Sequence, residues 1–312
     1  MSRYKAVHKT LLSWYEREGR HSLPWRLTDD IYHVYLSEIM LQQTQVNRVR
    51  DEYYPLFLEK FPTIKHLADA DLNEVLSLWS GLGYYRRARN LYLSAKLSKD
   101  GLPTSLKELK SLPGVGDYTA SAVCSFALHQ SVPVVDTNIS RVLKRHFGLL
   151  GVKDKIIWKY AEKFLNIEQP RAHNLALMDL GSMICTLKSA ECDICPLEKN
   201  CQGKEEPTLY TQTKKKEYIK MELYFGVLVQ ENKIALKFSD DNMYKDMLTL
   251  PKVDPLEENF LGSFKHAYTK YRLDVNIYKI EEIDGEIVWI DLEEFDSAPI
   301  SSLTKKAKKF FE

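Results

Sequence analysis

The chain has 312 residues and a formal net charge of +1, with 44% hydrophobic and 28% charged residues. The length favours two domains, and the composition is that of an ordinary globular protein. A balanced charge gives no global sign of nucleic-acid binding, so such a function has to rest on local motifs. The start of the chain lacks the apolar core of a signal peptide, and no stretch approaches the ~18 apolar residues that cross a bilayer. We therefore expect no membrane partner, and a cytoplasmic location, or a nuclear one in a cell that has a nucleus.

The second predicted helix carries a glutamate on its apolar face. Residues 1–22 predict a first amphipathic helix, Leu-Pro-Trp-Arg at 23–26 ends it, and the second runs from about residue 31 into the 40s. There Glu38 shares a face with Val34 and Leu41. Burial raises the pKa of an unpaired carboxyl group. A surface glutamate on a misjudged face and a buried structural ion pair are the alternatives.

Two polar segments after this glutamate are suited to DNA. Three glutamines at positions 42, 43 and 45 offer amide donors and acceptors, although a solvated helix end would look the same. Helices are predicted at 53–60, 72–79, 87–98 and 105–109. The loop at 80–90 holds two glycines, two tyrosines and three arginines. Tyrosines can wedge between bases while arginines meet phosphates. The alternative is a glycine cap followed by a helix with a solvated basic face.

A glycine hairpin lies between two further predicted helices. The sequence Leu-Pro-Gly-Val-Gly at 112–116 supplies residues that tolerate a positive φ, and the next helix starts at Asp117. The free backbone N–H groups at the start of that helix are suited to a phosphate. A tight hairpin between helices without any ligand is the alternative.

A second carboxylate follows a short extended run at 132–135. Asp136 precedes apolar residues at helical spacing, so it is expected to cap a helix. A carboxylate that accepts backbone N–H groups stays ionised at neutral pH, so its pKa is expected to stay low. Glu38 and Asp136 would then have pKa values pushed apart, which is the pattern used to split a glycosidic bond.

Four of the five cysteines are clustered, as Cys185-x6-Cys192-x2-Cys195-x5-Cys201. In a reducing compartment such a cluster indicates a metal site rather than disulfides. The spacing differs from common zinc fingers and from the ferredoxin run, and by itself it leaves zinc open. Cys124 stands apart and is interpreted as a small buried apolar residue.

The composition changes after Cys201. A polar segment at 202–216 is interpreted as a linker. Strands are predicted at 223–229, 233–238, 271–280 and 286–290. A helix or loop at 292–296 and a solvated basic tail at 305–309 complete the chain.

Taken together, these motifs resemble the helix-hairpin-helix DNA glycosylases of the endonuclease III superfamily, most closely the adenine DNA glycosylases of the MutY type. The resemblance rests on motifs that occur in one order: Leu-Pro-Trp at 23, Ser-Glu-Ile-Met-Leu-Gln-Gln-Thr-Gln-Val at 37, Gly-Leu-Gly-Tyr-Tyr at 81, the hairpin, Val-Asp-Thr-Asn at 135, Met-Asp-Leu-Gly-Ser-Met-Ile-Cys at 178, and the cysteine spacing. It implies a multi-domain α and α+β protein. An all-α glycosylase domain at 1–205, with a [4Fe–4S] cluster loop at 185–201, would be joined by a linker at 206–220 to a smaller α+β Nudix-like domain at 221–312.

The resemblance also implies a reaction. Adenine opposite 8-oxoguanine or guanine in double-stranded DNA would be flipped out and its N-glycosidic bond cut. Glu38 matches the acid that protonates adenine at N7, Asp136 matches the carboxylate that stabilises the sugar cation, and Tyr118 and Asn138 match residues that support this pair. The residues that match the family's DNA contacts are Gln43, Gly81, Tyr84, Arg86, Leu112, Gly114, Val115 and Gly116, with Gln43 and Tyr84 inserted around the lesion. Cys185, Cys192, Cys195 and Cys201 match the cluster ligands, and a monomer is the family's default.

Tyr118 favours a monofunctional enzyme. Glycosylase/lyases that resemble endonuclease III have a lysine at this position, whose amine forms a Schiff base and cuts the strand, and a phenol cannot do so. In the C-terminal part, the family's Phe-Ser-His reader of the lesion is replaced by Tyr268-Thr269-Lys270, in which Tyr268 keeps an apolar wedge and Thr269 a hydroxyl. The Nudix hydrolysis motif is absent from the sequence. The alternatives are a thymine-mismatch or oxidised-pyrimidine glycosylase, a non-catalytic sensor of DNA damage, and an iron–sulfur protein of electron transfer.

Overall fold

The computed structural model describes residues 4–211, 217–240, 243–245, 247–255, 258–296 and 298–312. It contains two compact units, of which the first comprises residues 1–68 and 93–213 and the second comprises residues 69–92 and 214–312. Five residues of the predicted linker, 212–216, lie outside the described part. The domain boundaries drawn from the sequence stay a prediction.

The N-terminal two thirds of the chain are helical. The α-helices are α1 Lys5–Glu18, α2 Ile31–Leu41, α3 Val46–Arg48, α4 Tyr54–Lys60, α5 Ile64–Asp69, α6 Leu72–Leu78, α7 Arg86–Leu97, α8 Leu106–Leu109, α9 Asp117–Phe126, α10 Thr137–His146, α11 Asp154–Phe164 and α12 Pro170–Met183. Shorter helices are η1 Pro24–Arg26, η2 Val49–Tyr53, η3 Cys192–Ile194, η4 Glu198–Asn200 and η5 Pro207–Tyr210. No helix in the described ranges is long and apolar enough to cross a membrane.

Helix caps position the two helices that carry the predicted carboxylates. The side chain of Asp30 accepts hydrogen bonds from the backbone N–H groups of Tyr32 and His33, so α2 begins at Ile31. Asp136 accepts from the backbone N–H of Ile139 and caps α10, as the sequence predicted. Neither α11 nor α12 was predicted from the sequence.

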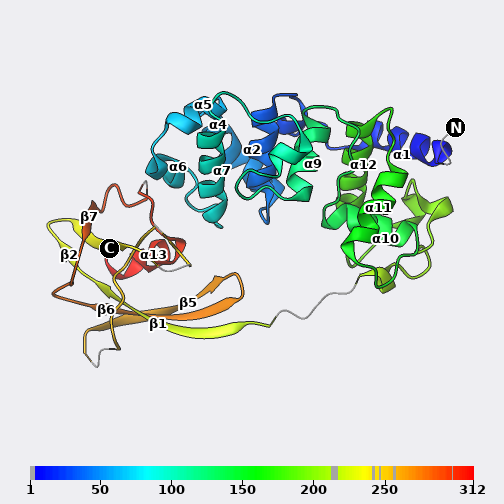
Figure 1. The fold of residues 1–312 in the computed structure, drawn as a ribbon. Coiled ribbons are helices and arrows are strands. Elements are labelled where there is room, and N and C mark those ends of the chain that lie inside the picture. The colour runs from blue at the N-terminus through cyan, green and yellow to red at the C-terminus, as the bar shows by residue number, and fades with distance from the viewer. Residues whose placement is uncertain (1–3, 212–216, 241–242, 246, 256–257, 297) are drawn as a thin grey trace. The chain divides into compact units, whose positions relative to one another are not determined.

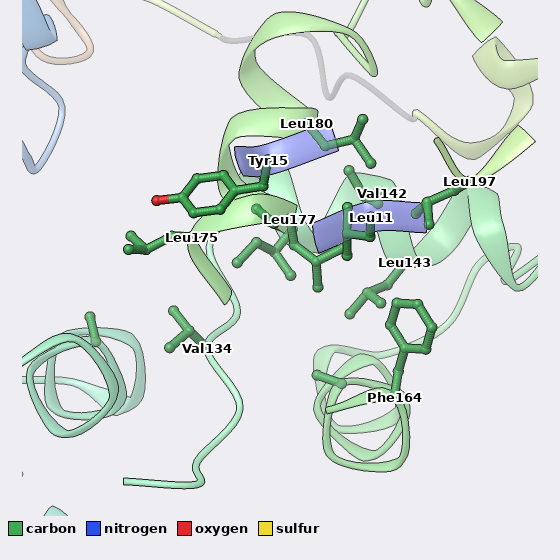
Figure 2. Packing of buried hydrophobic residues seen from close by; sticks show 14 of the residues in the cluster. Leu11, Tyr15, Val134, Val142, Leu143, Phe164, Leu175, Leu177, Leu180 and Leu197 are labelled. Carbon is green, nitrogen blue, oxygen red and sulfur yellow. The ribbon is translucent and has the colours of Figure 1, made fainter. Parts of the chain in front are cut away.

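The main hydrophobic core of the first unit gathers around α10 and α12. Figure 1 shows these helices beside α1 and α11. In Figure 2, Leu11 of α1, Leu143 of α10 and Phe164 of α11 lie among the side chains of this cluster. Each of the three is fully buried. The apolar side of α10 therefore fixes the helix whose capping residue is Asp136. Cys124 is also fully buried, as expected from the sequence.

The C-terminal region is α+β. Its strands are β1 Ile219–Val227, β2 Val229–Gln230, β3 Lys233–Phe238, β4 Leu248–Thr249, β5 Phe260–Tyr268, β6 Tyr271–Lys279 and β7 Val288–Asp291, followed by α13 Ser302–Ala307 and η6 Lys308–Phe310. One sheet has the order β1-β6-β5, and in a second sheet β3 pairs with β2, β4 and β7. The basic tail at 305–309 lies in α13 and η6, which the sequence did not predict. Lys306 and Lys309 are exposed, as expected, whereas Ala307 is buried.

Candidate active site

Glu38 lies on α2 with an exposed fraction of only 4%. The hydroxyl group of Tyr118, on α9, donates a hydrogen bond of 2.6 Å to Glu38 Oε2. Burial raises the pKa of Glu38 to about 7, and the hydrogen bond from Tyr118 opposes this rise. Burial also raises the pKa of Tyr118 well above its ordinary value, so the phenol stays neutral and donates. The raised pKa that the apolar face predicted for Glu38 is confirmed.

Asp136 has a different set of hydrogen bonds. Its Oδ1 accepts from the Ile139 N–H at 2.6 Å, and its Oδ2 accepts from Asn138 Nδ2 at 2.9 Å. The sequence predicted that its pKa would stay low, and this is wrong: the pKa is raised, because burial outweighs the opposing bonds from Ile139 and Asn138. The Asp136 carboxylate thus caps α10 and is also partly removed from water.

A chain of hydrogen bonds runs from Asp136 into the cysteine loop. The Asn138 side chain that donates to Asp136 accepts in turn from Arg141 Nη2 at 2.9 Å. Arg141 Nε donates to the backbone carbonyl of Cys185 at 2.8 Å, and Nη2 also donates to the carbonyl of Gly181. The rotamer of Asn138, and through it the position of the Asp136 carboxylate, is therefore fixed from α12. The sequence motifs did not indicate Arg141.

Glu38, Tyr118, Asp136 and Asn138 line one cavity of about 230 Å³. The described residues around it include three arginines, Arg20, Arg26 and Arg171, and no lysine. A larger cleft of about 1090 Å³ shares these four residues and extends past Gln43 and the glycine hairpin. The structure thus brings together all four residues assigned to catalysis from the sequence.

A buried ion-pair cluster at this cavity carried no assigned role in the sequence. Asp179 of α12 is fully buried and accepts from both nitrogens of the Arg26 fork, at 2.6 and 2.8 Å. Arg20 adds a bond of 2.7 Å from Nε. Burial raises the pKa of Asp179, but the bonds from Arg26 and Arg20 outweigh it, and the net pKa is lowered. Both Arg26 and Asp179 occur in quoted motifs, but they lie 153 positions apart, so the sequence does not reveal that they pair.

The glycine hairpin connects α8 to α9. Gly114 has a φ of +75°, the left-handed conformation that glycine adopts readily. Gly116 does not need this freedom, because its φ is −96°. A Cβ at Gly116 would meet nothing within 4 Å, so the space above it is open. Leu112 and Val115 are buried and anchor the hairpin. Gly116 caps α9 without a side-chain bond, so the first N–H groups of the helix receive no side-chain cap.

Three residues assigned to DNA contacts have left-handed backbones although they are not glycine. Their φ values are +58° for Gln43, +50° for Tyr84 and +49° for Thr269. Such conformations cost free energy and are concentrated at functional sites. Thr269 is β-branched and forms the turn between Tyr268 and Tyr271, the last pair of the β5–β6 hairpin. No sequence pattern predicted these conformations.

The loop before α7 combines buried and exposed residues. Gly81 has a φ of +90°, Tyr84 is 37% exposed and Arg86 is exposed. Arg87, in contrast, is 7% exposed, so the alternative of a wholly solvated basic face does not describe it. Within the second unit, Tyr268 lies near enough to Tyr84 and Arg89 for their charges to affect its pKa, which burial raises.

The four clustered cysteines line one small cavity of about 20 Å³. Arg145 of α10 is 2% exposed and reaches this cavity, with Nη1 3.2 Å from Cys185 Sγ. The same guanidinium donates to the carbonyls of Thr186, Leu187 and Pro207, which ties the cysteine loop to α10. Among the described residues, no group of three or more His, Cys, Asp or Glu side chains is arranged to hold a metal ion.

Comparisons with known proteins agree on one family. The family profile described as "HhH-GPD superfamily base excision DNA repair protein" matches residues 36–178. An adenine DNA glycosylase of Buchnera aphidicola subsp. Baizongia pistaciae is 34% identical over 97% of both chains. The human adenine DNA glycosylase is 39% identical over 64% of this chain and 40% of its own length.

Solved structures share the fold of the helical part. A thermostable thymine-DNA glycosylase matches 65% of this chain and 96% of its own, with a TM-score of 0.60 and 29% identity. An endonuclease III in a non-covalent complex with DNA matches 66% of this chain and 98% of its own, with a TM-score of 0.56 and 22% identity, which shows the fold alone. Together with the nearly full-length match to the Buchnera enzyme, these findings show that the chain belongs to the adenine DNA glycosylases of the HhH-GPD superfamily of base excision DNA repair proteins.

Proposed function

We propose that this DNA glycosylase removes adenine paired with 8-oxoguanine or guanine in double-stranded DNA and leaves an abasic strand uncut. The observation that carries the proposal is the cavity of about 230 Å³ in which Glu38 and Asp136 both lie. Two carboxyl groups with different hydrogen-bond partners are suited to the two roles that hydrolysis of a glycosidic bond requires.

Glu38 is proposed as the general acid. With a pKa of about 7, roughly half of the Glu38 side chains carry a proton at neutral pH. That proton would pass to N7 of the flipped adenine as the bond from the sugar to the base breaks and its electron pair goes to the base. Tyr118 keeps the Glu38 carboxyl group in one orientation through its 2.6 Å hydrogen bond.

Asp136 is proposed to stabilise the cationic sugar. Its carboxylate is held on two sides, by the Ile139 N–H and by Asn138 Nδ2, so it cannot rotate away from a positive charge that develops nearby. Water then adds to the sugar carbon and gives up one proton to the Glu38 carboxylate, which restores the acid and completes an abasic site. No lysine is found among the described residues that line the cavity of about 230 Å³, and Tyr118 is a phenol. Lys144 lines only the larger cleft. This supports the proposal that no amine forms a Schiff base and that the strand is left uncut.

The test is excision by the purified protein from duplexes that carry A:8-oxoG, A:G, A:C and T:G, analysed with and without alkali. We expect adenine release that is fastest opposite 8-oxoguanine, and strand breaks only after alkali. Glu38→Gln should slow release by about 10²–10⁴-fold, the usual contribution of a general acid. Breaks without alkali, or full activity of the glutamine variant, would contradict the proposal.

A thymine-mismatch glycosylase is the second candidate. The thermostable thymine-DNA glycosylase shares the fold at 29% identity, and Tyr118 with Asp136 is compatible with that activity. The same set of duplexes separates the two, because only this candidate releases thymine from T:G and leaves A:8-oxoG intact.

We also propose that Cys185, Cys192, Cys195 and Cys201 hold a [4Fe–4S] cluster. Although the four described thiols are not arranged as a set of metal ligands, they line one cavity. The buried guanidinium of Arg145 beside Cys185 is suited to a group of negative charge. Such a cluster would link the turns of the cysteine loop covalently. Brown protein that contains iron and acid-labile sulfide in equal amounts supports this assignment, whereas zinc in the purified protein overturns it.

The C-terminal part is proposed to be a Nudix-like reader of the opposite base. Tyr268 and Thr269 lie at the end of the β5–β6 hairpin, where Thr269 is exposed and the Tyr268 ring packs 4.9 Å from the ring of Tyr244. We further propose that the protein acts as a monomer, because all four catalytic residues come from one chain.

A further inference from the structure

A buried arginine lies beneath the loop that carries Tyr84. The Arg87 guanidinium lies over the ring of Trp79 at 5.3 Å and over the ring of Tyr84 at 5.4 Å. Trp79 is fully buried, whereas Tyr84 is 37% exposed. One cation therefore connects a fixed ring of the core to the ring that the family resemblance assigns to insertion into DNA. Cation–π contacts of this kind are strongest when the cation is shielded from water.

The same guanidinium also holds the loop backbone. Arg87 Nη2 donates to the carbonyls of Leu82 and Gly83, at 3.3 and 3.0 Å. Trp79 Nε1 donates to the Gly83 carbonyl as well, at 3.1 Å. These carbonyls precede Tyr84, whose φ is +50°. A non-glycine residue remains in the left-handed region when its surroundings hold it there.

The chemistry of these contacts requires arginine. A planar guanidinium stacks on rings while its N–H groups donate in the plane of the fork, and a lysine ammonium does not combine both. Burial lowers the pKa of Arg87 to about 10, which still leaves it charged at neutral pH.

We propose that Arg87 is a positioning residue that holds Tyr84 in a preformed conformation for insertion into the base stack of the duplex. The inference rests on the proposed function, because it deepens the role of Tyr84 in that reaction. Arg87 itself is buried and acts through Tyr84. The neighbouring Arg86 is exposed and remains assigned to direct contact with DNA.

The test compares Arg87→Lys with the wild type. The lysine keeps the positive charge and removes the planar fork. We expect amide hydrogen exchange to quicken in residues 80–86 and to stay unchanged in the hairpin at 112–116. The preference for A:8-oxoG over A:C should fall about five- to ten-fold, the effect of losing one or two cation–π contacts. Lys96→Gln, which removes an exposed cation from the same helix, is the matched control and should leave both measurements unchanged.

A double-mutant cycle with Tyr84→Ala decides whether Arg87 acts through that ring. If it does, the double variant loses no more preference than Tyr84→Ala alone. Additive losses, an unchanged preference in Arg87→Lys, or equal slowing on every duplex with faster exchange throughout the helices would each overturn the inference. A wild-type protein that releases no adenine refutes the proposed function instead, and the exchange comparison then still tests whether Arg87 holds the loop.

Discussion

The Tyr118 hydroxyl group and the Glu38 carboxyl group together determine how excision should depend on pH. Glu38 acts in its protonated form, so the rate is expected to fall as pH rises through its pKa of about 7. The hydrogen bond from Tyr118 stabilises the ionised carboxylate and so lowers this pKa, against the larger effect of burial. The two residues come from different helices, α2 and α9, and meet at 2.6 Å.

Tyr118→Phe should therefore move the alkaline limb of the pH profile to higher pH. The phenylalanine keeps the ring in its packing and removes only the hydrogen bond that lowers the pKa of Glu38. Single-turnover rates of adenine release between about pH 5.5 and 9 measure the shift. Glu38→Gln is the control, because it has no carboxyl group to titrate and should lose the limb. A limb at the same pH in both wild type and Tyr118→Phe would show that Glu38 does not control the rate.

Gly181 and Gly116 differ in what surrounds the position that a Cβ atom would occupy. A Cβ at Gly181 of α12 would lie 2.7 Å from Asn138 Cβ and 2.9 Å from its backbone oxygen, so the contact between α10 and α12 depends on this glycine. A Cβ at Gly116 would meet no protein atom within 4 Å. Protein atoms occupy the space beside Gly181, whereas the space beside Gly116 is open to a ligand.

We expect Gly181→Ala to reduce stability and Gly116→Ala to reduce DNA binding. Overpacking at Gly181 should cost roughly 1–3 kcal/mol and slow excision, because Asn138 is displaced from Asp136. Gly116→Ala should leave the unfolding temperature unchanged and weaken binding to an uncleavable duplex, because the methyl group occupies space where a phosphate approaches. Thermal unfolding and binding measured on both variants check this. The prediction fails if both variants lose stability equally.

Local patterns predicted those parts of the fold that depend on neighbours along the chain. The apolar face of α2 placed Glu38 in the core and predicted its raised pKa correctly. The cap at Asp136 was predicted for the same reason, since its partner Ile139 is three residues away. Its pKa was predicted in the wrong direction, because burial depends on how distant helices pack around it.

Contacts between residues far apart along the chain could not be predicted from the sequence. The ion pair between Arg26 and Asp179 joins residues that lie 153 positions apart, and Arg141 reaches Cys185 across 44 positions. Pairs separated by so many positions leave no periodic pattern in the sequence. The strained backbones of Gln43, Tyr84 and Thr269 were equally hidden, because each is held by its surroundings and not by its own preference.

At the scale of the whole molecule, the proposed tasks fall into different units. Glu38 and Asp136 belong to the first unit, and Tyr84 and Tyr268 belong to the second. The loop before α7 is close in sequence to the helices of the first unit, yet it forms a compact body with the C-terminal sheets. Excision and lesion reading are therefore proposed to rest on residues of different units.

The core of the first unit contains three buried histidines around Phe164. The rings of His8, His146 and His173 each lie 5.2 or 5.3 Å from the ring of Phe164. Burial lowers the pKa of His146 to about 4 and that of His173 to about 3. His8 also has a lowered pKa through burial, although its hydrogen bond to the Phe164 carbonyl and the charge of Glu168 oppose the shift. All three are neutral in the folded protein at pH 7.

Acidification should therefore destabilise the first unit at a pH well above that needed for its carboxylates. In the unfolded chain a histidine binds a proton below about pH 6.5, whereas the folded His173 does so only below about pH 3. The stability that these neutral rings contribute is complete above pH 6.5 and falls as pH decreases toward 3. His173→Leu should flatten this dependence by roughly 2 kcal/mol between pH 7 and 4.5, with the exposed His66→Leu as its control. Urea unfolding across this range measures the difference. Equal slopes in wild type and His173→Leu would show that the ring is not held neutral in the folded core.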